Sequence, residues 1–187
     1  NMVSFFGTFS PIILIILVLS YSLFKDTGIE LNKRFKRYFF ARIEQFIADE
    51  TKLIMKHNLY DLVRNTGRVN GFHIEHILAN NSENHSLFNE DKDRFETERN
   101  RLGGLLILKG SDNISSNNEI FANKLKSYAN TLYWNETLRE DSYKSKLDFE
   151  RMIKNTNLNF RAMNKFGAEE LEERHKLLFE IVQIIWN

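Results

Sequence analysis

A short apolar segment that holds two histidines and an acid is the part of this sequence best suited to chemistry. Residues 72–78 read Phe-His-Ile-Glu-His-Ile-Leu, so Glu75 and His76 are adjacent, and Asp112 and Asn113 follow a second apolar segment. Carboxylate and amide oxygens are the ligands that Mg²⁺ prefers. An imidazole with a pKa of about 6.5 is a proton acceptor at physiological pH. Phosphodiester hydrolysis requires these groups, because a cation must neutralise the phosphate while a base activates water.

A regular strand would keep Glu75 and His76 apart, because adjacent strand residues point to opposite faces. Their side chains converge only if the strand ends, twists or forms a bulge there. The polar residues that begin at Asn80 favour an early end. The alternative from the residues alone is a partly buried polar pair. A zinc site at His73 and His76 is not indicated, since the spacing differs from His-Glu-x-x-His and no helix carries it.

Two strands, a turn and a helix are expected to position these groups. Residues 72–78 predict a strand, and residues 102–108 predict a tight turn that leads into a buried strand. Residues 80–100 are polar and predict a long surface loop, with room for one helical turn. Ser and Asn caps at residues 115–117 predict a helix after them, and a last helix is expected from about Ala168.

Amphipathic helices are expected before the first strand. From Glu30 onward, bulky apolar residues recur at helical intervals. Residues 49–64 continue the helical pattern, and Asn-Thr-Gly at residues 65–67 ends it. We therefore expect a helical region over residues 1–67 and a second domain over residues 68–187. Five cations lie between the apolar residues and form either a phosphate-binding face or a solvated face whose stems cover apolar surface: Lys33, Arg34, Lys36, Arg37 and Arg42.

Composition limits the class of protein. A chain of 187 residues has room for one ordinary domain, or for a small domain with an appendage. Lys and Arg number 26 against 25 Asp and Glu, so any binding of nucleic acid must come from local clustering of charge. The absence of cysteine excludes disulfides, thiol nucleophiles and cysteine-ligated zinc. It also fits a reducing, cytoplasmic compartment.

The first 24 residues carry no charge and require a separate interpretation. The dense apolar run at residues 12–19 is shorter than the roughly 20 residues of a membrane-spanning helix. A signal peptide would need a cationic start and a small-residue cleavage site, and neither is present. We expect a buried helix, with membrane association through residues 11–24 as the alternative.

The order and spacing of these segments resemble the HNH (His-Asn-His, ββα-metal) nucleases. More narrowly, they resemble the C-terminal nuclease domain of the GmrSD-type modification-dependent restriction endonucleases. That domain has an Ile-Glu-His-Ile strand, then Leu-Gly-Asn-Leu-Thr-Leu-Leu, then an Asn turn and a helix with Phe-x-x-Lys. The matching pieces here are residues 74–77, residues 102–108, Asn113 and residues 121–124. The similarity covers about residues 70–187.

The resemblance implies an α+β, mostly helical fold: a ββα-metal (HNH) core with an N-terminal helical bundle and a long C-terminal helix. It implies that His76 is the general base and that Glu75 and Asn113 are ligands of Mg²⁺ or Mn²⁺. Lys124 would lie near the phosphate or organise the site, unless it is a solvated helix lysine.

Two further residues, His73 and Asp112, are candidates to support the metal ligands. In an alternative interpretation, His73 is itself a metal ligand. One departure from the family pattern is Gly104, which stands where relatives have the Asn that helps to orient the base. Losing that hydrogen bond would cost about 1–3 kcal/mol. Catalysis would then be roughly tenfold to a hundredfold slower.

The function expected is that of a metal-dependent DNA endonuclease domain in a prokaryotic restriction or phage-defence system, with modified DNA among its substrates. The sequence holds no phosphate-binding Gly-rich loop. The resemblance implies a nucleotide-hydrolysing partner domain, which would therefore lie elsewhere on a longer protein or on another chain. Cutting both strands would require a homodimer or two nicks. The alternatives are a catalytically degenerate nucleic-acid- or partner-binding module of the same fold, and a membrane-tethered helical protein.

Overall fold

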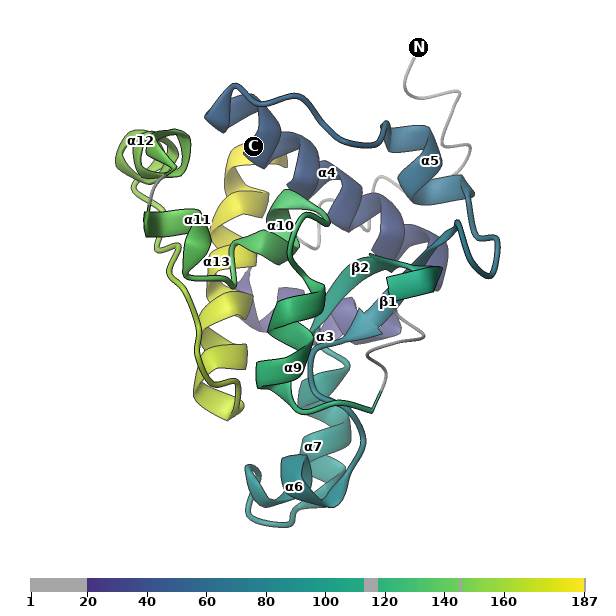
Figure 1. Ribbon diagram of the computed structural model, residues 1–187. Helices are drawn as coiled ribbons and strands as arrows, with labels where there is room; N and C mark the ends of the chain where they lie inside the picture. Colours follow the sequence, from purple (N-terminus) through teal and green to yellow (C-terminus); the bar gives the residue numbers. More distant parts are fainter. Residues whose placement is uncertain (1–19, 113–117, 145, 187) are drawn as a thin grey trace.

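Helices surround a small two-stranded antiparallel sheet, so the fold is α+β and mostly helical, as the sequence predicts (Figure 1). The computed structural model describes residues 20–112, 118–144 and 146–186. The elements, in chain order, are α3 (Tyr21–Glu30), α4 (Lys33–Thr51), α5 (Leu59–Arg64), β1 (Phe72–His76), α6 (Ser82–Ser86), α7 (Lys92–Arg99), the 3₁₀ turn η1 (Leu102–Gly104), β2 (Leu105–Lys109), α9 (Phe121–Ser127), α10 (Tyr133–Glu136), α11 (Asp141–Lys144), α12 (Leu147–Thr156) and α13 (Ala168–Trp186).

The two predicted strands are confirmed. β1 and β2 pair in a register that runs from Phe72 opposite Lys109 to His76 opposite Leu105. The backbone hydrogen bond from Ile77 N–H to the Gly104 carbonyl, 2.9 Å long, extends this contact past the end of β1. His76 therefore lies at one end of the hairpin, next to the turn that starts β2. The last helix, α13, also begins at the predicted Ala168.

Two predictions of local structure are wrong, and helix caps explain both. A continuous helix over residues 49–64 does not form, because α4 ends at Lys52, whose φ of 63° is left-handed, and α5 begins only after the Asn58 cap. Residues 80–100 are not a loop but hold α6 and α7. The side chains of Asn81 and Asp91 accept hydrogen bonds from the first turns of these helices. Such caps stabilise short polar helices that have little apolar periodicity.

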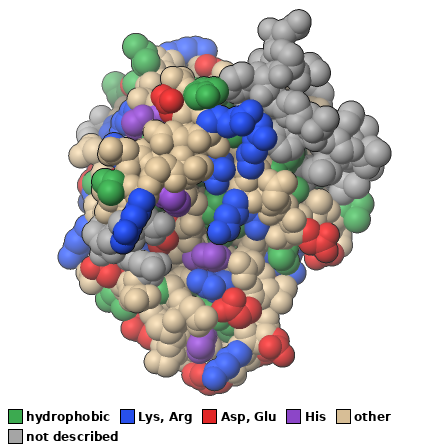
Figure 2. Space-filling view, turned by 90° about the vertical axis from the view of Figure 1, so that its right-hand side faces the viewer, with side chains coloured by type: hydrophobic (Ala, Val, Ile, Leu, Met, Phe, Trp, Pro, Cys, Tyr) green, Lys and Arg blue, Asp and Glu red, His purple; other side chains and the backbone are tan. Residues whose placement is uncertain are grey.

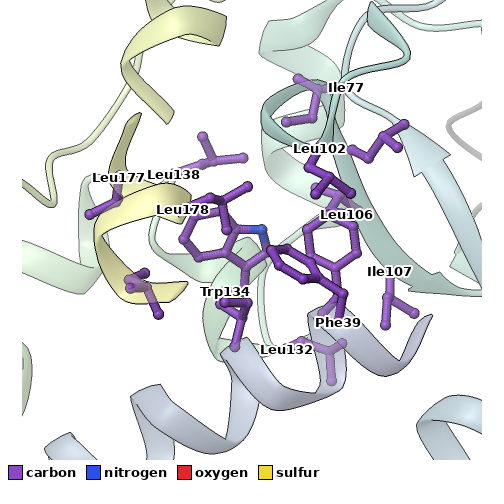
Figure 3. Close-up of a cluster of buried hydrophobic side chains, with 14 of the residues drawn as sticks. Phe39, Ile77, Leu102, Leu106, Ile107, Leu132, Trp134, Leu138, Leu177 and Leu178 are labelled. Carbon is purple, nitrogen blue, oxygen red and sulfur yellow. The ribbon is translucent and has the colours of Figure 1, made fainter. Parts of the chain in front are cut away.

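One hydrophobic core joins the helices to the hairpin. Figure 3 shows Trp134 of α10 among Phe39 of α4, Leu106 of β2 and Leu178 of α13, and all four are buried. α4 contacts both strands, so it covers one side of the sheet. Because this core includes residues on both sides of position 67, the helical region and the hairpin pack as neighbours. The domain boundary itself stays a prediction.

Within the described residues, no helix is long and apolar enough to cross a membrane. The apolar run at residues 12–19 lies outside the described part of the chain. The alternative of membrane association through residues 11–24 therefore stays open.

A buried histidine fixes the turn that precedes β2. His175 on α13 is fully buried, and its Nδ1 accepts a hydrogen bond of 3.1 Å from the Gly103 N–H in η1. A Cβ at Gly103 would lie 2.8 Å from the Leu171 carbonyl oxygen, so only glycine allows this approach. Burial lowers the pKa of His175 to about 3.

We expect acid to destabilise the fold through His175. Above pH 6.5 the folded and unfolded chains both hold the neutral imidazole, so this group adds no pH dependence. As the pH falls below 6.5, the unfolded chain binds a proton that the folded chain does not, and stability falls until the pH nears the folded pKa of about 3. At about pH 5 the loss is about 2 kcal/mol.

Urea unfolding of the wild type and of His175→Asn measures this effect. The Asn side-chain oxygen can accept the Gly103 N–H but does not titrate. The wild type should lose stability relative to this variant between about pH 7 and pH 5. Parallel pH profiles for the two proteins would contradict the assignment.

Candidate active site

His76 is half-buried at the end of β1, and its ring is held by a residue of α7. The His76 Nε2 lies 2.9 Å from Oδ1 of Asn100, the C-terminal cap residue of α7. Asn100 in turn donates from Nδ2 to the backbone carbonyl of Glu96 at 2.7 Å. The ring of His76 is thus fixed through a side chain that is itself anchored to the helix.

This chain of contacts also determines where the imidazole proton sits. A backbone carbonyl can only accept, so the Asn100 atom that faces Glu96 must be the amide nitrogen. The Asn100 oxygen therefore faces His76 and needs a donor, which makes Nε2 the protonated nitrogen. The lone pair of neutral His76 is then on Nδ1. Within the described part of the chain Nδ1 has no hydrogen-bond partner, so this nitrogen is available to accept a proton.

Electrostatics favour the neutral ring. Burial lowers the pKa of His76, and the positive charges of Arg99 and Lys124 lower it further. The hydrogen bond to Asn100 and the charge of Glu96 oppose this shift without cancelling it. His76 is therefore neutral at physiological pH, which is the state that a general base requires.

Asn100 was missed in the sequence, and it changes the expectation for Gly104. Position 104 has no room for a side chain, because a Cβ there would lie 2.7 Å from the Arg99 carbonyl oxygen. The sequence predicts that His76 lacks an orienting partner, but the structure provides Asn100. Asn100 lies only four residues before Gly104, but it could not be recognised as a partner of His76 because residues 80–100 were predicted to be a loop.

Glu75 and Lys124 form a buried ion pair on the other side of the strand end. The Lys124 Nζ lies 2.5 Å from Glu75 Oε1, and both side chains are almost fully buried. The same ammonium donates to the His76 carbonyl oxygen at 2.7 Å. Burial raises the pKa of Glu75, and the Lys124 charge opposes that rise. Lys124 is therefore not a solvated helix lysine, because it is buried and holds the backbone at His76.

The predicted metal ligands are not brought together by the described residues. The Glu75 carboxylate is already neutralised by an ammonium group. No group of three or more His, Cys, Asp or Glu that could hold a metal ion occurs in the described part of the chain. Asn113, the second predicted ligand, lies outside it. The described residues alone therefore do not fit a divalent cation, and we derive no catalytic step through one.

The two predicted supporting residues lie away from His76. The ring of His73 makes a hydrogen bond of 3.2 Å with the Gly67 carbonyl, in the connection before β1. Asp112 is half-buried beyond the end of the hairpin where Phe72 pairs with Lys109, whereas His76 marks the opposite end. Both residues therefore lie toward the end of the hairpin opposite His76.

Comparison with known proteins identifies the family. The family model described as GmrSD restriction endonucleases, C-terminal domain, matches residues 22–181. The chain belongs to this family. The GmrSD resemblance predicted from the sequence is thereby confirmed, and the chain is a domain related to restriction endonucleases. No curated protein and no solved structure matches the chain.

We expect the Glu75–Lys124 pair of this GmrSD domain to be a strong stability determinant. Lys124→Met would leave a buried carboxylate without its partner, which costs about 3–5 kcal/mol. The double variant Glu75→Gln/Lys124→Met buries no charge and should recover most of that loss.

Chemical denaturation measures the free energy of unfolding of each protein. Lys126→Met is the matched control, because Lys126 is exposed on the same helix and should change stability by less than about 0.5 kcal/mol. Equal stability of Lys124→Met and this control would show that the pair is not buried in solution.

Proposed function

We propose that this domain is an endonuclease that hydrolyses phosphodiester bonds in DNA, with His76 as the general base. The observation that carries the proposal is the neutral His76 ring, which Asn100 orients through Nε2 and which keeps Nδ1 available. We also propose that β1, β2 and the helix that carries Lys124 correspond to the ββα core of the HNH nucleases. Membership of the GmrSD family supports DNA as the substrate.

In this mechanism, Nδ1 of His76 takes the proton from a water molecule as that water attacks the phosphorus. The bond from phosphorus to one deoxyribose oxygen breaks, and that oxygen leaves and takes a proton from solvent water. The resulting imidazolium keeps its Nε2–H on the Asn100 oxygen, and the nearby charge of Glu96 favours the charged ring. The Lys124 ammonium holds the His76 carbonyl, so the base does not shift along the strand. General-base action of this kind contributes about 10²–10⁴-fold to a rate.

A requirement for Mg²⁺ or Mn²⁺ is proposed from the family resemblance alone, with Glu75 and Asn113 as the expected ligands. When bound, such an ion would neutralise charge on the phosphate and the leaving oxygen. The assignment requires Glu75 to be shared with Lys124 or released by it, since the two are in contact.

The second candidate function is a binding module that kept the fold and lost turnover. The observation that favours it is the same Glu75–Lys124 pair, because a neutralised carboxylate is a poorer ligand for a cation. DNA binding without cleavage would select this candidate.

The wider setting is also a proposal. We expect cytoplasmic action on DNA, including modified DNA, in a restriction or phage-defence system. We also propose that the domain works with a nucleotide-hydrolysing partner domain and that two copies of it pair.

The first experiment measures cleavage of supercoiled plasmid with Mg²⁺ or Mn²⁺. The wild type should nick the plasmid, and His76→Ala should reduce the rate by about 10²-fold or more because no base remains. His57→Gln is the matched control, since His57 lies before α5 against Phe72, at the other end of the hairpin. Unchanged cleavage by His76→Ala would overturn the mechanism.

A second prediction concerns Asn100. Asn100→Ala should slow cleavage by roughly tenfold to a hundredfold, because the His76 ring loses its orienting partner. Asn100→Asp should retain an acceptor while its negative charge raises the pKa of His76. The acid limb of the pH–rate profile should therefore move to higher pH in Asn100→Asp. Full activity of Asn100→Ala at every pH would show that the ring needs no such partner.

A further inference from the structure

Positive charge is concentrated in two segments that the chemistry above does not use. Residues 31–43 hold five Lys or Arg, and residues 62–74 hold Arg64 and Arg68, whereas neither segment contains Asp or Glu. The whole chain is nearly neutral, with 26 basic and 25 acidic residues. A segregation of this kind produces a local positive field that net charge does not reveal.

The two segments are joined in the fold. Nε of Arg37, on α4, donates to the Val63 carbonyl in α5 at 3.0 Å, and α4 packs along α5. Nζ of Lys36 donates to the Ile29 carbonyl at 3.0 Å. These partners are neutral carbonyls, so the side chains are ordered while their positive charge remains uncompensated. Arg34 lies close by, because burial and then the charge of Arg34 lower the pKa of Arg37.

Exposed arginines extend this surface toward the hairpin. Arg64 ends α5 and Arg68 lies in the α5–β1 connection, and both are exposed. No carboxylate of a described residue lies within 4.0 Å of either guanidinium group, whereas many cations elsewhere are paired, such as Arg161 with Glu173. The basic strip is defined here as Lys33, Arg34, Lys36, Arg37, Arg64 and Arg68.

The basic strip leads to the candidate base. The His73 ring contacts the Gly67 carbonyl beside Arg68, and β1 then continues to His76. Figure 2 faces this side of the molecule and shows Lys and Arg gathered beside histidines. The five residues of β1 span about 13 Å, so a DNA backbone that follows β1 passes from the basic strip to His76 within a few nucleotides.

We propose that the basic strip is the surface on which the phosphate backbone of duplex DNA docks, and that it directs a phosphate a few nucleotides away to His76. This rests on the proposed nuclease function for its substrate. It adds the place at which the DNA binds and its path across the domain, because the DNA backbone would run from α4 and α5 along β1.

The test compares Arg64→Gln/Arg68→Gln with Lys154→Gln/Lys176→Gln in the whole chain. Each double variant removes two exposed positive charges, and Lys154 and Lys176 lie on α12 and α13, outside the basic strip. Binding of a fluorescein-labelled DNA duplex is followed by anisotropy over a range of salt concentrations. All proteins also carry His76→Ala and are measured in EDTA, so that the DNA is not cleaved during the binding measurement.

The Arg64/Arg68 variant should bind about tenfold or more weakly, and its slope of log affinity against log salt should fall by about two. The control variant should bind like its parent. Equal affinity and slope of the two variants would overturn the docking surface, even if wild-type cleavage depends on His76. Conversely, loss of binding at Arg64 and Arg68 in a chain that never cleaves DNA would support the surface and refute only the nuclease proposal.

Discussion

The account of this domain depends on one hydrogen-bonded chain, from the Glu96 carbonyl through the Asn100 amide to the His76 ring. The carbonyl cannot donate, so it fixes the amide, and the amide fixes the imidazole proton on Nε2. Two further contacts hold the backbone around this arrangement. The Lys124 ammonium holds the backbone of His76, and the His175 contact with Gly103 holds the turn beside it. The nitrogen that is proposed to accept the proton is therefore determined by hydrogen bonds that begin on α7.

Much of the fold could be predicted from the sequence because its periodicity is strong. Short apolar runs predicted the two strands of the hairpin, and the spacing of apolar residues predicted the long helices α4 and α13. The short polar helices α6 and α7 were missed because they bury few side chains. Their caps, Asn81 and Asp91, were the usable signals. The family was predicted from segment order and is confirmed, whereas the boundary at residue 67 stays a prediction.

The site was less predictable because its contacts join distant residues. His76 could be singled out from its type and its strand, but Asn100 reaches it from the end of a helix that was not expected. Glu75 and Lys124 were both identified as site residues, yet 49 positions separate them and nothing local shows that they pair. Tertiary pairing turned a candidate metal ligand into one half of a buried ion pair. The sequence likewise does not show that the cations of α4 lie next to α5, because that contact depends on the tertiary fold.

Nitrogen-detected NMR of the histidine side chains at neutral pH tests the central claim most directly, because the two ring nitrogens report their protons separately. The account predicts that His76 is neutral, with its proton on Nε2 and an unprotonated Nδ1, and that Asn100→Ala loosens this preference. A His76 ring that carries both protons at neutral pH, or that holds its single proton on Nδ1, would contradict it.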